Sequence, residues 1–509
     1  MADSTVNIFE SSELEHQAQA AVHAVFRTVR ERAAEWEAHQ AEAFALEAMR
    51  QFGRLALREY FREKGEGNVG PTLEDNKGNL YKRDSRRRRT YFSVFGKVDV
   101  TRLSYRAEGV PTAIFPLDAL ANLPDRQYSF LLHERIALAA QSGAFKEEMA
   151  KLARLTGTRI SDSVAQVVAR EVGRHCDAFY EGKEPLQAAS EVDVLAVGFD
   201  GKGVPLLASE VAKAAKPARG KAVKATDVGK KMATVGVCYD VAMKNRDAER
   251  LACDLVYPEE RQQRRASEAD HPPGESEPAK AYNVRRMASI ARPRGDVFDA
   301  IEQEALARDP HGERPLAILM DGEHALEREA TKRFKAWPVR FLILDLLHVL
   351  GYLWSAARAL CVEGDKHHTA RQAFVFERLM KILDGQAGYV AGGLQSSATK
   401  RGLKGKARKA VDACATYFRN HLHMMQYDEY LHWGLPIATG LVESACGSVV
   451  QHRMEGQGKR WTLAGAESIL RLRSLRSSDG AWDTYFAAYP AHERTRNHGK
   501  VLPILKKAA

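Results

Sequence analysis

VDVLAVGFDGKGVPL, residues 192–206, predicts a buried strand that ends on an acid. The stretch is apolar for most of eight residues, reaches one carboxylate at Asp200, and becomes apolar again after Gly201-Lys202-Gly203. Apolar runs on both sides of a Gly-x-Gly sequence predict a strand, a turn and the start of an antiparallel strand. A buried carboxylate needs a partner or a metal ion. The end of this strand is therefore a candidate site.

Two later stretches repeat the arrangement. Leu316–Met320 is apolar and is followed by Asp321-Gly322, and Phe341–Leu344 is apolar and is followed by Asp345. Three buried strands that each end on an aspartate would bring three carboxylates to one edge of a sheet. We expect the chemistry of the protein at that edge.

The composition indicates an intracellular protein with a polyanionic partner. A chain of 509 residues is long enough for about two to four domains. Its formal net charge of +10 favours nucleic acid, although a basic enzyme need not bind it. The six cysteines form no Cys-x-x-Cys pair, which argues against a zinc ribbon or a disulfide framework. No signal-peptide core or membrane-spanning run is visible, so we expect a cytoplasmic protein, nucleoid-associated when bound to DNA, with no membrane contact.

Residues 1–70 predict an N-terminal helical segment. Residues 11–64 contain no Pro and a single Gly, and they are rich in Ala, Glu, Gln, Arg and Leu. Two interpretations stay open: a helical hairpin that packs on its own domain, or a pair of helices that forms a dimer.

Residues 71–125 predict a basic β-hairpin region. Runs rich in aromatic and β-branched residues flank a predicted turn at Gly96-Lys97, and the basic run KRDSRRRR precedes them at 82–89. Arginines beside Tyr and Phe suit a nucleic-acid backbone, although most charge runs are only solvated surface. The candidate DNA contacts are Arg86, Arg87, Arg88 and Arg89.

Residues 126–188 predict a helix-turn-helix-like DNA-binding domain. One helix is predicted at Phe145–Leu155, a turn at Thr156-Gly157, and a following helix with Ser161 as its N-cap. A short helix, a Gly turn and a capped helix outline a helix-turn-helix, although other helical hairpins share this outline.

The remaining blocks predict an α/β core that is interrupted by helices. A further strand is predicted at Met232–Val241 and a helix at Asp296–Arg308, whereas 209–231 and 258–278 predict a basic loop and a solvated loop. The predicted domains are 189–360, the first part of the core; 361–433, an all-helical insertion; 434–480, the core segment with Glu443; and 481–509, a C-terminal tail.

The acidic residues predict a metal site. Glu443 begins a helix after the loop 434–440, and its face, shared with Gly447 and Val450, is expected to lie against the sheet and hold Glu443 close to the core. Asp200, Asp321 and Glu443 form an oxygen-only ligand set that suits Mg²⁺ or Mn²⁺. Two such ions would serve an in-line phosphoryl displacement. Spacing alone leaves open that these are three unrelated surface acids.

Several phrases resemble the ISKra family of bacterial insertion-sequence transposases. The resemblance covers most of the chain from about Leu80 to Arg476. The phrases read VGFDGKGVP, ILMDGEHAL, LDLLHVLGYLW, LPIATGLVESACGSVVQHRMEGQGKRW and ILRLRSLRS. The resemblance implies an RNase H-like core with a DDE triad, which by motif is Asp200, Asp321 and Glu443. Similarity to the wider Mutator-like group implies an Asp-x-x-His after the second Asp, here Asp345 and His348, and a helical insertion before the Glu.

The resemblance also implies accessory residues, and this chain departs from the family pattern at one position. Asp345 and His348 are expected to orient a scissile phosphate or water, although His348 alone is as typical of a structural histidine. Members of this family often carry cysteine pairs near the hairpin, whereas this chain has Tyr105–Gly109 there, so zinc at that position is not expected. Further candidate DNA contacts, in the helical insertion and after Glu443, are Lys400, Arg401, Lys404, Arg453, Lys459, Arg460 and Trp461.

The sequence therefore predicts a DDE transposase that uses two Mg²⁺ or Mn²⁺ ions. It would bind terminal inverted repeats, hydrolyse a phosphodiester and direct the freed 3′-hydroxyl at target DNA, as a homodimer or higher oligomer. Two alternatives stay open: a DNA-binding protein derived from a transposase that has lost cleavage, and a structure-selective nuclease with the same core.

Overall fold

The computed structural model describes residues 13–183, 193–214, 229–260, 262, 280–361, 369–438, 440–456 and 458–508. The chain is α/β, and it divides into two compact units, Met1–Ala178 with Asp483–Ala509, and Phe179–Trp482. Most of the predicted loops 209–231 and 258–278 lies outside the described residues. Among the described residues, every helix is too short or too polar to cross a bilayer.

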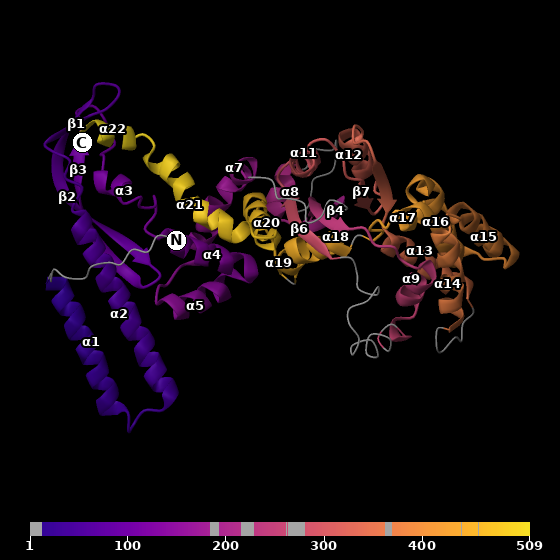
Figure 1. Cartoon of the computed structure of the whole chain (residues 1–509), viewed down its shortest axis with the longest axis horizontal. Helices are drawn as coiled ribbons and strands as arrows, with labels where there is room; N and C mark the ends of the chain where they lie inside the picture. The colour runs from indigo at the N-terminus through magenta and orange to yellow at the C-terminus, as the bar shows by residue number, and fades with distance from the viewer. Residues whose placement is uncertain are drawn as a thin grey trace. The chain divides into compact units, whose positions relative to one another are not determined.

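The first unit begins with a helical hairpin and a three-stranded antiparallel sheet. Helices α1 (Glu13–Arg32) and α2 (Ala38–Lys64) lie side by side (Figure 1). The sheet order is β1-β2-β3. Because Ser93 already pairs with Gly96, the hairpin turns at Val94-Phe95, two residues earlier than predicted. The strands are β1 (Thr72–Glu74), β2 (Leu80–Ser93) and β3 (Gly96–Arg106).

Helices complete the first unit. The predicted helices after residue 126 are present, and the Ser161 hydroxyl caps α6 by accepting a hydrogen bond from the Val164 amide. The helices that complete the unit are α3 (Pro116–Leu120), α4 (Phe130–Ser142), α5 (Phe145–Thr156), α6 (Asp162–Val172), α7 (Cys176–Glu181), α21 (Ala481–His498) and α22 (Leu502–Ala508).

The predicted C-terminal tail is wrong as a description of residues 481–509. Helix α21 packs within the first unit, where Glu493 lies 2.6 Å from His175 and the Tyr485 hydroxyl bonds the Val172 carbonyl. Tyr485 and Tyr489 are fully buried. The aromatic residues of this segment are therefore core residues.

The second unit contains a five-stranded sheet with the order β6-β5-β4-β7-β8. Strand β4 pairs antiparallel with β5, and it pairs parallel with β7, which pairs parallel with β8. Strand β6 was not predicted. The strands are β4 (Asp193–Pro205), β5 (Lys230–Ala242), β6 (Ala281–Ser289), β7 (Leu316–Met320) and β8 (Arg340–Leu344).

The turn predicted at Gly201-Lys202-Gly203 is wrong. Strand β4 runs through these residues without interruption, and they pair with Met232–Thr234 of β5. Pairing with β5 continues through this stretch, so the two glycines remain extended. Asp200 consequently lies inside a long strand, at the level where the shorter parallel strands end.

Helices cover both faces of this sheet. Phe199 stacks on Phe298 of α11 at a ring separation of 3.8 Å, whereas Gly198 faces Val442 of α18. Successive residues of a strand point to opposite faces, so α11 and α18 cover different sides. The helices around the sheet are α8 (Ala208–Ala214), α9 (Ala248–Val256), α11 (Arg294–Arg308), α12 (His324–Phe334), α13 (Leu346–Leu360), α18 (Gly440–Ala445), the π-helix η3 (Cys446–Gln451), α19 (His452–Met454) and α20 (Leu463–Ser477).

The region after α13 is a helical block, as the sequence predicts. The described part of residues 361–433 contains no strand. In Figure 1 helices α13 to α16 gather together, and α16 packs against both α13 and α15. The block consists of α14 (Thr369–Leu383), α15 (Ala387–Lys400), α16 (Gly405–Asn420), η2 (Leu422–Met424) and α17 (Tyr427–His432).

Candidate functional site

Three aspartates follow register-matched residues on three adjacent parallel strands. Phe199 of β4 pairs with Met320 of β7, and Met320 pairs with Leu344 of β8. The next residue in each strand direction is Asp200, Asp321 or Asp345. Since neighbouring strands lie about 4.8 Å apart, the three carboxylates are delivered to one edge of the sheet. The predicted grouping of the three aspartates is present, although Asp200 lies within β4 and not at its end.

Asp200 is half-buried and hydrogen-bonded on both oxygens. Its Oδ1 accepts from the Gly201 amide at 2.6 Å, and its Oδ2 accepts from the Cys446 thiol at 3.0 Å. Burial raises the pKa of Asp200, and the negative charge of Asp321 adds to that increase, while the two hydrogen bonds oppose it. A cation at this edge would relieve the repulsion between the two carboxylates.

Asp321 lies in a turn that the helical block supports. Its Oδ1 accepts from the Glu323 amide at 2.9 Å, and its backbone carbonyl accepts from the Tyr417 hydroxyl at 2.6 Å. Gly322 has a φ of +88°, which favours glycine, and a Cβ there would crowd His421. The turn therefore needs both a glycine and the close approach of α16.

Asp345 and His348 form the predicted pair. Asp345 is fully buried and caps α13, because its Oδ1 accepts from the Leu347 amide at 3.2 Å. Its Oδ2 lies 2.6 Å from Nδ1 of His348, whose side chain is 46% exposed. This hydrogen bond raises the pKa of His348, and the charges of Asp321 and Asp200 also raise it. The pair therefore holds an imidazole, whose protonated form the neighbouring acids favour, at the edge that carries Asp200 and Asp321.

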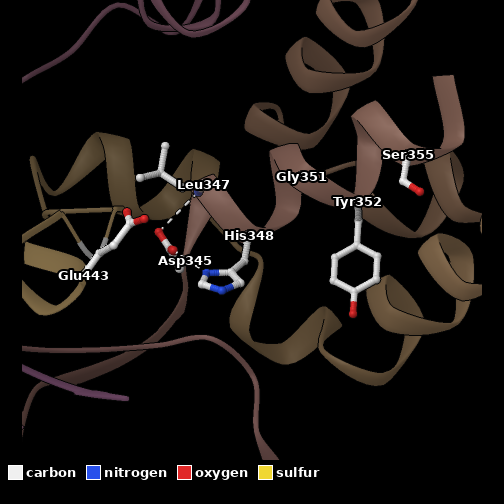
Figure 2. A pocket seen from close by; sticks show the side chains of 7 residues that line it. All are labelled: Asp345, Leu347, His348, Gly351, Tyr352, Ser355 and Glu443. Atoms are coloured by element: carbon white, nitrogen blue, oxygen red, sulfur yellow. Dashed lines mark hydrogen bonds and ion pairs between the residues drawn. The ribbon is translucent and has the colours of Figure 1, made fainter. Parts of the chain in front are cut away.

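Glu443 lines the same pocket as Asp345 and His348. The pocket has a volume of about 390 Å³, and Figure 2 shows the Glu443 carboxylate on the side of the pocket near Asp345. The other lining residues are Leu347, Gly351, Tyr352 and Ser355. Residues beside Glu443 contact β4, because Val442 packs against Gly198 and Cys446 bonds Asp200. Glu443 thus lies in a pocket with Asp345, on a segment whose neighbouring residues contact β4.

The expectation that Glu443 is held close to the core is wrong. Glu443 is exposed, and Val442 and Cys446 face the sheet instead. The expected face assumed regular α-helical spacing through Val450, but α18 ends at Ala445 and a π-helix follows. A π-turn changes the angular position of each later residue, and such turns are frequent at functional sites.

Sequence reasoning missed Cys446 and Tyr417. Cys446 is buried and donates to Asp200, so the site is not formed by oxygens alone. Tyr417 stacks on the pocket residue Tyr352 at 4.0 Å while it holds the Asp321 carbonyl. Neither residue belongs to a sequence motif that predicts its role. Only the position of Cys446, three residues after Glu443, was a usable signal.

The four arginines of β2 have different environments. Arg87 and Arg88 are exposed, and Arg86 is exposed and paired with Glu66 at 2.8 Å. The Arg89 side chain is only 10% exposed, and it bonds Asp118 at 3.0 Å together with carbonyls of residues 124–126. Arg89 is therefore a structural residue, and its prediction as a DNA contact is wrong.

The basic residues after Glu443 also divide into two groups. Arg453 is buried and lies over the ring of Trp461 at 4.7 Å, and Trp461 is buried beside the end of β4. Both are packing residues, so their prediction as DNA contacts is wrong. Arg460 is exposed and Lys459 is half-buried.

Lys400, Arg401 and Lys404 lie at the turn between α15 and α16. Lys400 and Lys404 are exposed, whereas one guanidinium nitrogen of Arg401 bonds the Leu360 carbonyl. Two cations of this turn thus remain directed to solvent, and the third also anchors the turn to α13.

The arrangement offers hard oxygen ligands, an imidazole with a raised pKa and an open pocket. Carboxylates at one sheet edge suit a hard divalent ion and a phosphate ligand. The chain matches no protein-family model, and no curated protein is significantly similar to it. The chemical interpretation therefore depends on the geometry of these residues.

Proposed function

We propose that this protein is a DDE transposase of a bacterial insertion sequence. It would cut DNA at the ends of its element by phosphodiester hydrolysis and join the freed 3′-hydroxyl to target DNA. The observation that carries the proposal is the shared register of Phe199, Met320 and Leu344, which brings Asp200, Asp321 and Asp345 to one edge of the sheet. Glu443 lines a pocket together with Asp345.

The sheet supports an RNase H-like core. Strand β5 lies between β4 and β6 and runs antiparallel to both. Strands β7 and β8 lie on the other side of β4 and run parallel to it. This order, with a helical block inserted before the Glu443 segment, is what an RNase H-like core with an insertion requires. The helices α4, α5 and α6 are a candidate helix-turn-helix.

The acidic residues fit two divalent ions, Mg²⁺ or Mn²⁺. Asp200 and Asp321 would hold both ions, and Glu443 would complete the set. When bound, such ions activate an attacking oxygen and stabilise a leaving oxygen in phosphoryl transfer. Burial raises the pKa of Asp200 and the charge of Asp321 adds to the increase, and a bound cation would offset both effects.

The other groups of the pocket would position the DNA strand. Asp345 fixes the Nδ1 side of His348, so the opposite ring edge is available to a phosphate oxygen. The raised pKa of His348 extends the pH range over which it is a cation. The exposed cations among the predicted contacts are Arg86, Arg87 and Arg88 in one unit, and Lys400, Arg401, Lys404 and Arg460 in the other. We propose that they bind phosphates of the terminal inverted repeats and of target DNA.

A joining assay tests the proposal. The full-length protein is incubated with Mg²⁺, labelled element ends and a supercoiled plasmid, and the products are cuts at the element ends followed by covalent joining to the plasmid. Cutting without joining would favour a structure-selective nuclease, and binding without cutting would favour a silent DNA-binding derivative. Joining needs two ends, so at least a dimer is expected in the active complex.

Two arginines of β2 should separate DNA contact from folding. Arg88→Ala removes one exposed cation and is expected to lower the salt slope of log K by about 1 without changing Tm. Arg89→Ala is expected to lower Tm, because Asp118 would lose a donor in a largely buried site. Fluorescence anisotropy over a salt series and thermal denaturation measure the two effects. An equal loss of affinity in Arg32→Ala, an exposed control on α1, would contradict the assignment.

The Cys446 thiol is expected to position Asp200. Cys446→Ala removes the donor to Oδ2 and should reduce cleavage about tenfold, since a hydrogen bond to a charged group contributes about 1.5 kcal/mol or more. Cys446→Ser keeps a donor and should cleave within about threefold of wild type. Cleavage rates over a Mg²⁺ titration measure the difference. Equal rates in the two variants would show that the thiol only fills space.

A further inference from the structure

The pocket beside the acids extends along α13 past the residues that the proposed chemistry uses. Figure 2 shows Glu443 and Asp345 on one side of His348, and Tyr352 and Ser355 on the other side. The wall beyond the acids is uncharged and consists of Leu347, Gly351, Tyr352 and Ser355, which lie on one side of the helix. Metal ions and a phosphate need only the acidic end, so this wall has no role in that chemistry.

Tyr352 is an aromatic surface that a second ring supports. Tyr417 of α16 stacks on the Tyr352 ring at a centroid separation of 4.0 Å and an interplanar angle of 16°. The Tyr417 hydroxyl donates to the Asp321 carbonyl, so the supporting ring is itself fixed at the sheet edge. Tyr352 is half-buried and lines the pocket, whereas Tyr417 is not one of the lining residues. Tyr417 therefore supports the ring from behind and holds it in place for a planar ligand.

Gly351 keeps space open in the same wall. The residue is exposed, and a Cβ added to it would meet no atom of the described residues within 4 Å. It lies inside α13, where glycine is less favourable than alanine because it loses more backbone freedom on folding. Close packing against the rest of the described chain does not account for this glycine. A ligand that occupies the open space would account for it.

The dimensions and chemistry of the wall fit an unpaired nucleobase. The pocket volume of about 390 Å³ lies within the range of about 300–1,000 Å³ that is typical of small-ligand sites. Tyr352 follows Asp345 by about 10 Å along the helix axis, so a strand with its phosphate at the acids can bring a nearby base to this ring. Bases stack well on aromatic side chains. A base inside a duplex is stacked on its neighbours and cannot enter such a pocket, so the base must be unpaired or turned out of the helix.

We propose that this wall of α13 binds one unpaired base of the DNA strand next to the phosphodiester that is cut. Tyr352 is the stacking surface, and Gly351 leaves the room that the base needs. The inference rests on the proposed function and adds the form of the substrate, which is a strand with a base outside the duplex. Stacking on Tyr352 would offset part of the free energy lost when the base leaves its neighbours. Every base has a π-face, so the site should accept all four bases.

DNA binding without a divalent ion tests the proposal apart from any cleavage. The full-length protein is titrated in EDTA with a duplex that carries one bulged 2-aminopurine, and with the same duplex fully paired. The wild type should bind the bulged duplex about tenfold more tightly, because a bulged base has no pairing to lose and gains the stacking contact. Stacking should also quench the 2-aminopurine fluorescence. Tyr352→Phe should keep both effects, and Tyr352→Ala should lose them.

Gly351→Leu separates the pocket from the stability of α13. The new side chain would fill the open space, and leucine is a better helix former than glycine. This variant should keep or raise Tm and yet lose the preference for the bulged duplex, whereas Gly393→Leu, at an open position of α15, should keep the preference. Equal binding of both duplexes by the wild type, or an unchanged preference in Gly351→Leu, would overturn the proposal. A protein that keeps the preference but neither cuts nor joins DNA in Mg²⁺ would instead contradict the proposed function alone.

Discussion

Asp200→Asn and Asp321→Asn should each reduce DNA cleavage by about 10³-fold or more while DNA binding stays within about twofold of wild type. Asparagine keeps the shape of the side chain but removes the charge that would hold a divalent ion. Neither change should lower Tm, because the fold disfavours the Asp200 charge. Burial and the neighbouring Asp321 both raise the pKa of Asp200, so neutralising one acid removes a repulsion. Gel-based cleavage rates, anisotropy and thermal denaturation give the three readouts.

Asp384→Asn is the matched control for this pair. Asp384 is an exposed acid of the helical block and contributes nothing to the sheet edge, so its variant should cleave like the wild type. Cleavage at a normal rate in either Asp200→Asn or Asp321→Asn would remove these carboxylates from the mechanism. Loss of cleavage together with an equal loss of DNA binding would instead indicate a general disturbance of the fold.

The strand ends could be predicted from sequence because their signal is local. Leu316–Met320 and residues 341–344 are unbroken apolar runs that stop at an acid, so β7 and β8 are recognisable without knowledge of their partners. Burial on both faces of a parallel sheet produces such runs. The position of Asp345 in the same row as Asp200 follows from pairing register, which the sequence does not contain.

Elements that depend on distant partners could not be predicted. Strand β6 alternates polar residues and carries no apolar run, and its strand identity comes from pairing with β5. Helix α21 looked like a tail because its partners, such as His175, lie more than 300 residues earlier. In each case the stabilising contact is long-range, and tertiary context overrides local propensity.

The same limit applies to the charged residues. Arg88 and Arg89 are neighbours in one basic run, and a strand necessarily points them to opposite sides. Which of them turns inward is decided by Asp118 on α3, so composition alone cannot separate a DNA contact from a buried pair. Arg453 was misassigned for a similar reason, because its partner Trp461 is contributed by a later turn of the chain.

The position of Glu443 depends on the absence of a side chain at residue 198. A Cβ on Gly198 would overlap a methyl group of Val442, which is buried and adjacent to Glu443. Gly198→Ala should therefore push α18 away from β4 and reduce cleavage about 100-fold, while DNA binding is kept. Val442→Ala alone should have only a small effect. The double variant Gly198→Ala/Val442→Ala should recover most of the activity, because the smaller side chain makes room for the new methyl group.

Recovery of cleavage in the double variant requires that the contact between residues 198 and 442 sets the position of Glu443. It therefore tests the site directly. Gly393→Ala on α15 is the matched control, because a Cβ there meets open space and should leave both activity and Tm at or above wild type. Single and double variants form a cycle whose interaction term should be about 1.5 kcal/mol or more in activation free energy. Additive losses in the double variant would mean that the Val442 contact does not position Glu443, and the carboxylate set would then reduce to the three aspartates of β4, β7 and β8.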